Sequence, residues 1–168
     1  MYDIFKPKKK DKVITEHFPP FTLNGCTLSF VTQLKYLGHV ISNTLNDDND
    51  IRREIRNLFM RTNMFDSRFC KCSTNFKLRL FKIYCLSMYD LGLWEHSTVT
   101  TFNKFRSCYN KCITKFFGYC RLDSMSGVLM QLHLPTADTV LHNARIMFHR
   151  QCVASCSSIV QCFETVGV

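Results

Sequence analysis

The chain has 168 residues, of which 46% are apolar and 13% aromatic, and it carries a net charge of +9. This length suffices for one domain, and fifteen Phe against one Trp indicate a core rich in phenylalanine. No apolar stretch reaches the length of a membrane span and no signal peptide is visible. We therefore expect an intracellular protein, cytoplasmic or nuclear, with no membrane partner and with cysteines that are mostly free thiols.

The N-terminal segment predicts a small antiparallel β-sheet. Residues 2–5 are typical of a short strand, and the lysine run that follows resembles a nuclear-localisation or phosphate-binding patch, although a solvated loop is the simpler interpretation (Lys6, Lys8, Lys9, Lys10 and Lys12). Asn24-Gly25 between two alternating runs is a strong hairpin signal, because both turn positions need a positive φ. The alternation predicts one buried face (Phe21, Leu23, Leu28 and Phe30). With residues 36–42, these segments predict three or four strands that need helices to pack on.

Residues 35–69 pass from a strand pattern to a long basic helix. The strand pattern contains Gly38, which indicates a bulge or a close approach of another group to the backbone. Asp47, Asp48 and Asp50 precede the helix, where carboxylates interact favourably with the positive end of the helix dipole. Apolar positions recur every three or four residues and predict one buried stripe (Ile51, Ile55, Leu58, Thr62, Phe65 and Phe69).

The rest of the chain is predicted to be helical. Apolar periodicity favours a second helix over 75–94 and a third over 98–118, which Gly118 is placed to end. Ser124 is placed to cap a short helix over 125–132, and Pro135 precedes a last helix that runs to about residue 155. The expected fold class is therefore α+β and mostly α, with a small N-terminal antiparallel sheet followed by four or five helices. We expect three parts, a sheet in 1–45, a basic helical bundle in 46–121 and a helical extension in 122–168.

The positive charge is concentrated in the helical centre of the chain. Residues 51–121 contain 14 Lys or Arg and 4 Asp or Glu, a net charge of +10, whereas the remainder has a net charge of −1. Six basic residues of the first two helices are candidates for nucleic-acid binding (Arg52, Arg53, Arg56, Lys77, Arg79 and Lys82). If these helices pack antiparallel, we expect the six side chains to cluster in one half of the bundle. Such contacts position a duplex without reading its sequence, although a basic helical face is often only solubilising.

The cysteines and histidines do not predict a metal site. The close pairs are Cys70/Cys72, Cys108/Cys112 and Cys152/Cys156, and the last two fall inside predicted helices rather than on the turns that zinc knuckles use. Buried thiols are the simpler interpretation. The spacing alone leaves open a site formed by residues near the C-terminus (His149, Cys152, Cys156 and Cys162).

The order of motifs resembles a known family. The sequence KYLGHVIS at 35–42, followed by NDDNDIRREIRNLFMRTNM at 46–64, is similar to the end of the palm and the start of the thumb in reverse transcriptases of non-LTR (LINE-type) retrotransposons. The resemblance continues through 72–85, 87–89, 93–94 and 121–124 and covers roughly residues 1–150. It implies a primer-grip hairpin followed by a helical thumb. The primer-grip-like residues would then be Tyr36, Leu37, Gly38 and His39, although packing at a strand end is an equal alternative for His39.

The family's catalytic motif does not occur in this sequence. The polymerases carry a Tyr/Phe-Ala-Asp-Asp turn that helps to hold two divalent cations, Mg²⁺ in the parent family, for phosphoryl transfer. The adjacent acidic pair Asp47-Asp48 follows the YLG element, whereas the catalytic turn of the family precedes it. We therefore expect a fragment that is not an enzyme by itself, with no catalytic residue, cofactor, metal ligand or small-molecule substrate.

The expected function is at most weak, non-specific binding of RNA–DNA or RNA duplex by a thumb-like helical region. Two alternatives stay open, a structural helical domain with no nucleic-acid role and a small zinc-binding module. A third alternative is a degenerate copy that is not made as a stable protein, because exposed strand edges and apolar surface promote aggregation.

Overall fold

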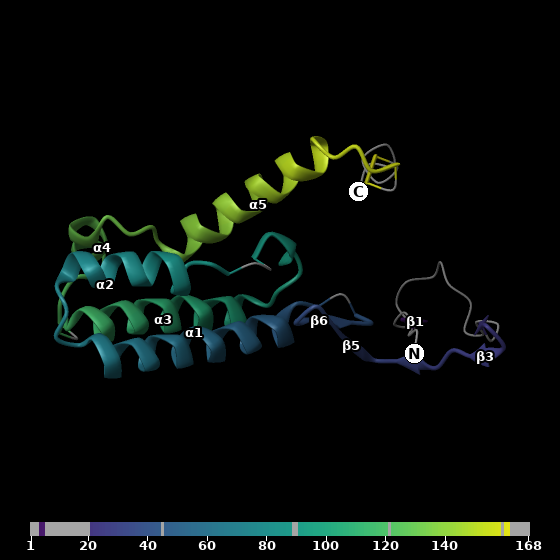
Figure 1. Cartoon of the computed structure of the whole chain (residues 1–168), viewed down its shortest axis with the longest axis horizontal. Coiled ribbons are helices and arrows are strands. Elements are labelled where there is room, and N and C mark those ends of the chain that lie inside the picture. Colours follow the sequence, from purple (N-terminus) through teal and green to yellow (C-terminus); the bar gives the residue numbers. More distant parts are fainter. Residues whose placement is uncertain are drawn as a thin grey trace.

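The structure, a computed structural model, describes residues 4–5, 21–44, 46–88, 91–120, 122–158 and 160–161. Its fold class is α+β and mostly α, with short strands at one end and a helical bundle at the other (Figure 1). The lysine run at 6–12, Arg121 and Cys162 lie outside the described residues, so the expectations that concern them stay expectations. Among the described helices, none combines the length and the apolar character that crossing a membrane requires.

In the part of the chain that the structure describes, the strands form three separate two-stranded pairs rather than one sheet. β2 (Thr22–Leu23) pairs with β3 (Cys26–Thr27) through the expected Asn24-Gly25 turn, whose φ angles are 49° and 77°. β5 (Gln33–Tyr36) pairs antiparallel with β6 (His39–Ser42), whereas β1 (Ile4–Phe5) pairs with β4 (Phe30–Val31) in parallel. The expected buried face of the first hairpin is not found, because Phe21 and Leu23 remain 42% and 39% exposed. Strands of two residues are too short to present a continuous apolar face to a helix.

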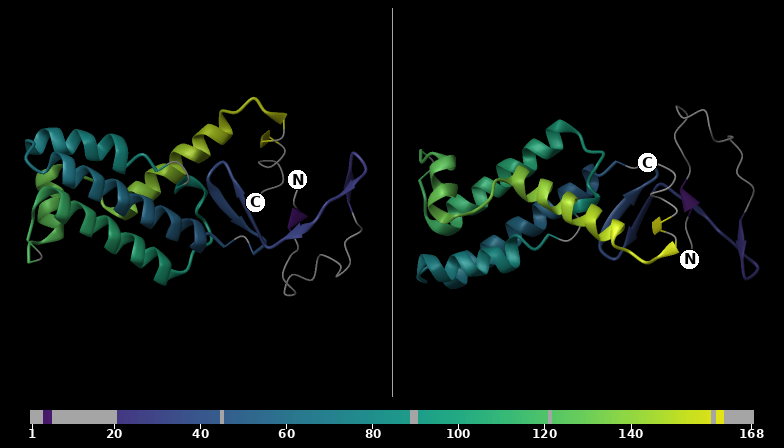
Figure 2. Two further views of the ribbon diagram at one scale, coloured as in Figure 1. Left: turned by 60° about the horizontal axis from the view of Figure 1, so that its bottom comes forward. Right: turned by 90° about the horizontal axis from the view of Figure 1, so that it is seen from above.

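The bundle is built on two parallel helices, α1 (Asp48–Phe69) and α3 (Val99–Phe117). The contacts follow the same direction along both helices: Asp48 meets Thr98 at one end, Cys108 Sγ lies 3.6 Å from the Ile55 carbonyl, and Phe65 packs against Phe116 further along. The chain between them returns antiparallel to α1, so that the three segments lie side by side (Figures 1 and 2).

The returning segment is shorter than the single helix expected over 75–94. α2 (Thr74–Leu80) continues into one π-helical turn, Phe81–Cys85, after which the chain leaves the helix, and its next described helical element is a 3₁₀ turn at Leu91–Leu93. The Arg61 guanidinium on α1 donates a hydrogen bond of 2.8 Å to the Tyr84 carbonyl at this end. That bond satisfies a terminal carbonyl that a continued helix would have used, so the helix ends here although the apolar periodicity continues.

The core lies where these three segments meet, and it is rich in phenylalanine as expected. The expected stripe of α1 faces inward: Ile51 and Leu58 are fully enclosed, and Thr62 and Phe65 are buried. Aromatic side chains from the other segments fill the space between the helices (Phe81, Trp94, Phe105, Tyr109 and Phe116). Edge and offset ring contacts such as that between Trp94 and Phe105, at 5.5 Å, add to the burial of apolar area.

Two further helices follow at the expected positions. α4 (Met125–Leu132) begins after Ser124, and α5 (Ala137–Val153) begins after Thr136, whose side chain accepts a hydrogen bond from the Thr139 amide. α5 leaves the bundle at an angle and packs mainly on the 3₁₀ turn (Figure 2). The approach is close at Gly92, where a Cβ atom would lie 2.8 Å from Cβ of Phe148. α5 is therefore held at the level of Gly92, while Met147 and Val153 stay exposed.

Candidate nucleic-acid interface

The residues Tyr36 to His39 form the turn of the β5–β6 hairpin. Leu37 and Gly38 occupy the two turn positions with φ angles of 48° and 90°, and Tyr36 pairs with His39 across the ladder. Gly38 is therefore part of a tight hairpin turn and not a strand bulge, which corrects one expectation, since two successive positive φ angles match a two-residue turn. The other expectation is met in part, because Arg53 Nη1 lies 3.7 Å from the position that a Cβ on Gly38 would occupy.

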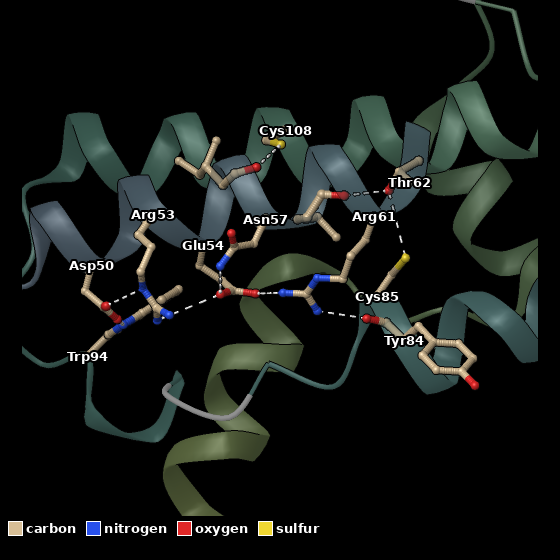
Figure 3. Close-up of polar contacts among 12 residues, drawn as sticks. Asp50, Arg53, Glu54, Asn57, Arg61, Thr62, Tyr84, Cys85, Trp94 and Cys108 are labelled. Atoms are coloured by element: carbon tan, nitrogen blue, oxygen red, sulfur yellow. Dashed lines mark hydrogen bonds and ion pairs between the residues drawn. The ribbon is translucent and has the colours of Figure 1, made fainter. Parts of the chain in front are cut away.

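Asp50 attaches this hairpin to the helical bundle, and Figure 3 shows Asp50 beside two of its partners, Arg53 and Trp94. Its side chain is fully buried, and Oδ1 accepts hydrogen bonds from the Val40 amide at 3.0 Å and from Arg53 Nε at 2.8 Å. Oδ2 accepts a bond of 2.9 Å from the indole N–H of Trp94 and lies 2.9 Å from His39 Nδ1. One carboxylate thus joins β6, the first turn of α1 and the segment that precedes α3.

The hydrogen bonds decide the ionisation of Asp50. Burial by itself would raise the pKa of this carboxyl, because a low-dielectric environment disfavours its charged form. The hydrogen bonds from Trp94, Arg53 and the Val40 amide outweigh burial, with a further contribution from His39, and the pKa lies below its ordinary value of 3.8. Asp50 is therefore ionised, and its negative charge is balanced by the positive charge of Arg53.

Asp47 and Asp48 bind the same segment from the neighbouring turn. Asp47 Oδ2 accepts hydrogen bonds from the amides of Glu95 and His96, at 2.9 Å and 2.8 Å. Asp48 accepts from the amide and the hydroxyl of Thr98; burial alone would raise its pKa, but these bonds lower it below the ordinary value. Asp47 and Asp48 therefore bind the segment just before α3, an interaction that the sequence did not indicate.

A second polar contact of α1 removes one arginine from the exposed basic surface. Arg61 donates to the buried carboxylate of Glu54 and to the Tyr84 carbonyl, and Asn57 Nδ2 donates to Glu54 at 3.3 Å (Figure 3). Asp50, Glu54 and Arg61 thus follow one face of α1, the face turned toward the returning segment. Arg61 has a structural role there.

The β5–β6 hairpin and the first turns of α1 together form a basic cleft of about 420 Å³. We use this name for the hollow lined by Gln33, Lys35, Val40, Asn49, Arg52, Arg53 and Arg56. Arg52 and Arg56 are exposed, Arg53 is mostly buried against Asp50, and Asn49 Oδ1 accepts a hydrogen bond of 3.2 Å from Arg52. Three of the six expected nucleic-acid-binding residues therefore meet in one place, beside the hairpin that contains Tyr36 to His39.

The other three residues lie elsewhere. α2 runs antiparallel to α1, so its start lies near the end of α1, where Phe76 packs against Phe69. Lys77 Nζ donates to the Phe116 carbonyl at 3.1 Å and lies over the Phe116 ring, while Arg79 and Lys82 are exposed. Arg53 and Phe69 are separated by about 24 Å along α1. The antiparallel packing therefore places the two basic sets at opposite ends of α1 and does not produce the single cluster that was expected.

Two residues of this region were not identified from the sequence: Lys35, which lines the basic cleft, and Trp94, which donates a hydrogen bond to Asp50. Lys35 belongs to a strand, so a search for basic residues on helix faces could not find it, although it directly precedes the YLG triplet. Trp94, the single tryptophan, directly precedes the residues that Asp47 and Asp48 bind. The sequence contains no signal that pairs Trp94 with Asp50, which lies 44 positions earlier.

The thiols and imidazoles of the described chain do not converge on a metal site. Within the described ranges, no three His, Cys, Asp or Glu side chains are placed to share a metal ion. The nine cysteines that the structure describes are free, and Cys108 Sγ lies 3.9 Å from Cys112 Sγ inside the core. Cys152 and Cys156, from the candidate zinc set, lie at the end of α5 and just beyond it.

Comparison of the chain with protein-family models, with curated proteins and with solved structures finds no match. The basic cleft and the hairpin beside it are therefore the observations from which a function can be argued.

Proposed function

We propose that the chain binds the sugar–phosphate backbone of an RNA–DNA or RNA duplex in the basic cleft, without reading sequence, as a thumb-like fragment of a non-LTR retrotransposon reverse transcriptase. The observation that carries the proposal is the meeting of Lys35 from β5 with Arg52, Arg53 and Arg56 from α1. The resemblance of the YLG element and the following helix to that family supports it independently of the charge.

The geometry of the cleft favours backbone contacts over base readout. Arg52 and Arg56 are four residues apart on one exposed face of α1, and Lys35 lies on the adjoining strand. Long cationic side chains on two rigid elements suit phosphate oxygens, which are recognised without regard to sequence. Because Arg53 is already paired with Asp50, about three cations are available, which predicts a salt dependence near three phosphates, with a slope of about −3 on a double-logarithmic plot.

The same proposal includes the absence of catalysis by this chain alone. The carboxylates of Asp47 and Asp48, the adjacent acidic pair, accept hydrogen bonds from backbone amides of residues 95, 96 and 98. They give this acidic pair a structural role, and the Tyr/Phe-Ala-Asp-Asp motif of the family does not occur in the sequence.

The test is binding of the purified chain to a fluorescently labelled 20-base-pair RNA–DNA hybrid across a salt series. The double variant Arg52→Ala/Arg56→Ala should weaken binding about tenfold or more at low salt and flatten the salt dependence by about two phosphates. The matched control is Arg79→Ala/Lys82→Ala, which removes the same charge from exposed positions of α2 and the π-helical turn, away from the basic cleft. Equal losses in both variants would mean that net charge and not the basic cleft is responsible.

The alternative of a helical domain with no nucleic-acid role has a specific observation in its favour. Arg53, Arg61 and Lys77 all donate to acceptors within the chain, so part of the basic surface is used for folding. A folded protein that does not bind the hybrid even at low salt would establish this alternative.

A further inference from the structure

A second hollow surface, on a different side of α1, contains exposed apolar side chains. It lies between α1 and α3, and its floor consists of Ile55, Phe59 and Met60 from α1 with Ser107 and Cys108 from α3, around a volume of about 510 Å³. A neighbouring hollow of about 790 Å³ shares Phe59 and Ser107 and extends to Tyr119 and Met125. We call the two together the α1–α3 groove.

The floor of the groove is apolar although it faces solvent. Phe59 is 44% and Met60 is 62% exposed, and they lie on the side of α1 away from the polar row of Asp50, Glu54 and Arg61. Parallel helices that leave such side chains between them offer a channel for another helix.

The rim of the groove is basic. Arg56 and Lys104 flank its first half and Lys111 the centre, and Lys115 stands in the second half, where its ammonium lies 5.8 Å from the centre of the Phe59 ring and 2.6 Å from Asn63 Oδ1. Among the described lining residues of both hollows, the acidic one is Asp123, at the far end. An occupant that fits this surface combines an apolar stripe with negative charge, most of it on the side that faces α3.

We propose that the α1–α3 groove binds an amphipathic, acidic helix of a protein partner, with its apolar stripe on Phe59 and Met60 and its carboxylates toward Lys104, Lys111 and Lys115. The groove follows α3 from Lys104 to Lys115, which corresponds to about 17 Å or three helical turns, and it continues past the end of α3 to Tyr119. A helix of about 15 residues with apolar side chains every third or fourth position matches this length and this surface.

The apolar floor, and not the charge of the rim, favours a peptide of this kind over nucleic acid in the groove. A polynucleotide carries its charge on a continuous backbone and exposes polar base edges, whereas the floor of the first hollow offers a single hydroxyl, Ser107, among apolar side chains. The polar side chains of Asn110 and Thr114 line only the second hollow. Buried polar groups without a hydrogen-bonding partner are costly, so bases would gain little there. The proposal is independent of duplex binding in the basic cleft, and Arg56, which lines both surfaces, is left unchanged in its test.

The probe is a fluorescein-labelled peptide of about 15 residues with leucine every third or fourth position and glutamate on the flanks, measured by anisotropy against the full chain. A peptide of identical composition with its leucines spread around the helix is the first control. The expected result is binding of the amphipathic peptide about tenfold or more tightly than the scrambled one, because only the former presents an apolar stripe.

Two variants locate the site. Lys104→Glu/Lys111→Glu reverses the rim and should weaken binding of the amphipathic peptide about tenfold or more, and Met60→Glu places a charge on the floor at an exposed position and should weaken it severalfold. The matched control Arg79→Glu/Lys82→Glu, at exposed positions of α2 and the π-helical turn, should leave it unchanged.

Equal binding of both peptides, or equal effects of both charge reversals, would overturn the proposal. So would a Lys104→Glu/Lys111→Glu protein that keeps the peptide but loses the RNA–DNA hybrid, since the groove would then serve nucleic acid. Loss of peptide binding with hybrid binding retained supports the proposal and separates it from the function of the basic cleft.

Discussion

Replacement of Asp50 by asparagine should cost the protein a large part of its stability. An asparagine keeps one acceptor oxygen and replaces the other with an NH₂ group, which cannot accept a hydrogen bond. In one orientation of the amide, the NH₂ group faces the donor Trp94 Nε1. In the other orientation, it faces the Val40 amide and Arg53 Nε. A buried donor that loses its acceptor costs about 1–3 kcal/mol, and the charge attraction to Arg53 is lost as well. We therefore expect the free energy of unfolding to fall by about 2–4 kcal/mol.

Urea unfolding followed by the fluorescence of Trp94, the single tryptophan, measures this loss, with far-ultraviolet circular dichroism as the second probe. The matched control is Asp66→Asn, which removes the same charge from a partly exposed position of α1 and should change stability by less than about 0.5 kcal/mol. If Asp50→Asn unfolds at the urea concentration of this control, the hydrogen-bonded carboxylate does not hold the hairpin and the bundle together.

The pH dependence gives the sign of the same effect. The pKa of Asp50 in the folded protein lies below its ordinary value of 3.8, so the stability it contributes is fully present above about pH 4 and is lost as pH falls through the folded-state pKa. The stability difference between the wild type and Asp50→Asn should therefore shrink as pH is lowered from 6 toward 3. A difference that stays constant over this range would contradict an ionised Asp50.

Two further predictions concern packing and thiol reactivity. Gly92→Ala should displace α5 and make it sensitive to limited proteolysis, because the new Cβ would lie 2.8 Å from Cβ of Phe148. The control Gly127→Ala, on the exposed face of α4, should be neutral or stabilising by up to about 1 kcal/mol. Equal proteolysis of the two variants would refute the close approach of α5 to Gly92. Burial raises the pKa of the Cys85 thiol to about 11, so native protein at pH 8 should be alkylated at exposed Cys70 and remain unmodified at Cys85 until it is unfolded, as peptide mass mapping would show.

Local sequence signals predicted the elements that local chemistry controls. Gly118, with a φ of 76°, ends α3 as expected, and Ser124 occupies the N-cap position of α4 as expected, although its side chain makes no capping hydrogen bond. The buried stripe of α1 also follows directly from its 3.6-residue period. These features depend on a few neighbouring residues, which is why a pattern can identify them.

Features that depend on distant partners could not be predicted in this way. The break after Cys85 is accompanied by a hydrogen bond from Arg61, 23 positions away from the carbonyl it binds, and the apolar pattern continues past it without a signal. The basic cleft was half anticipated: the arginines of α1 were identified from their helix face, but the contribution of Lys35 depends on how the hairpin is attached through Asp50.

The parallel arrangement of α1 and α3 also affects how the chain can acquire its structure. Asp48 and Thr98, which join the two helices at their first turns, are 50 positions apart, and Ile55 and Cys108 are 53 apart. Helical bundles whose neighbours are joined by short loops form mostly local contacts and fold quickly, whereas contacts of long sequence separation require a large loop to close first. During synthesis, the side of α1 that packs on α3 therefore stays exposed until the returning segment and the start of α3 have been made.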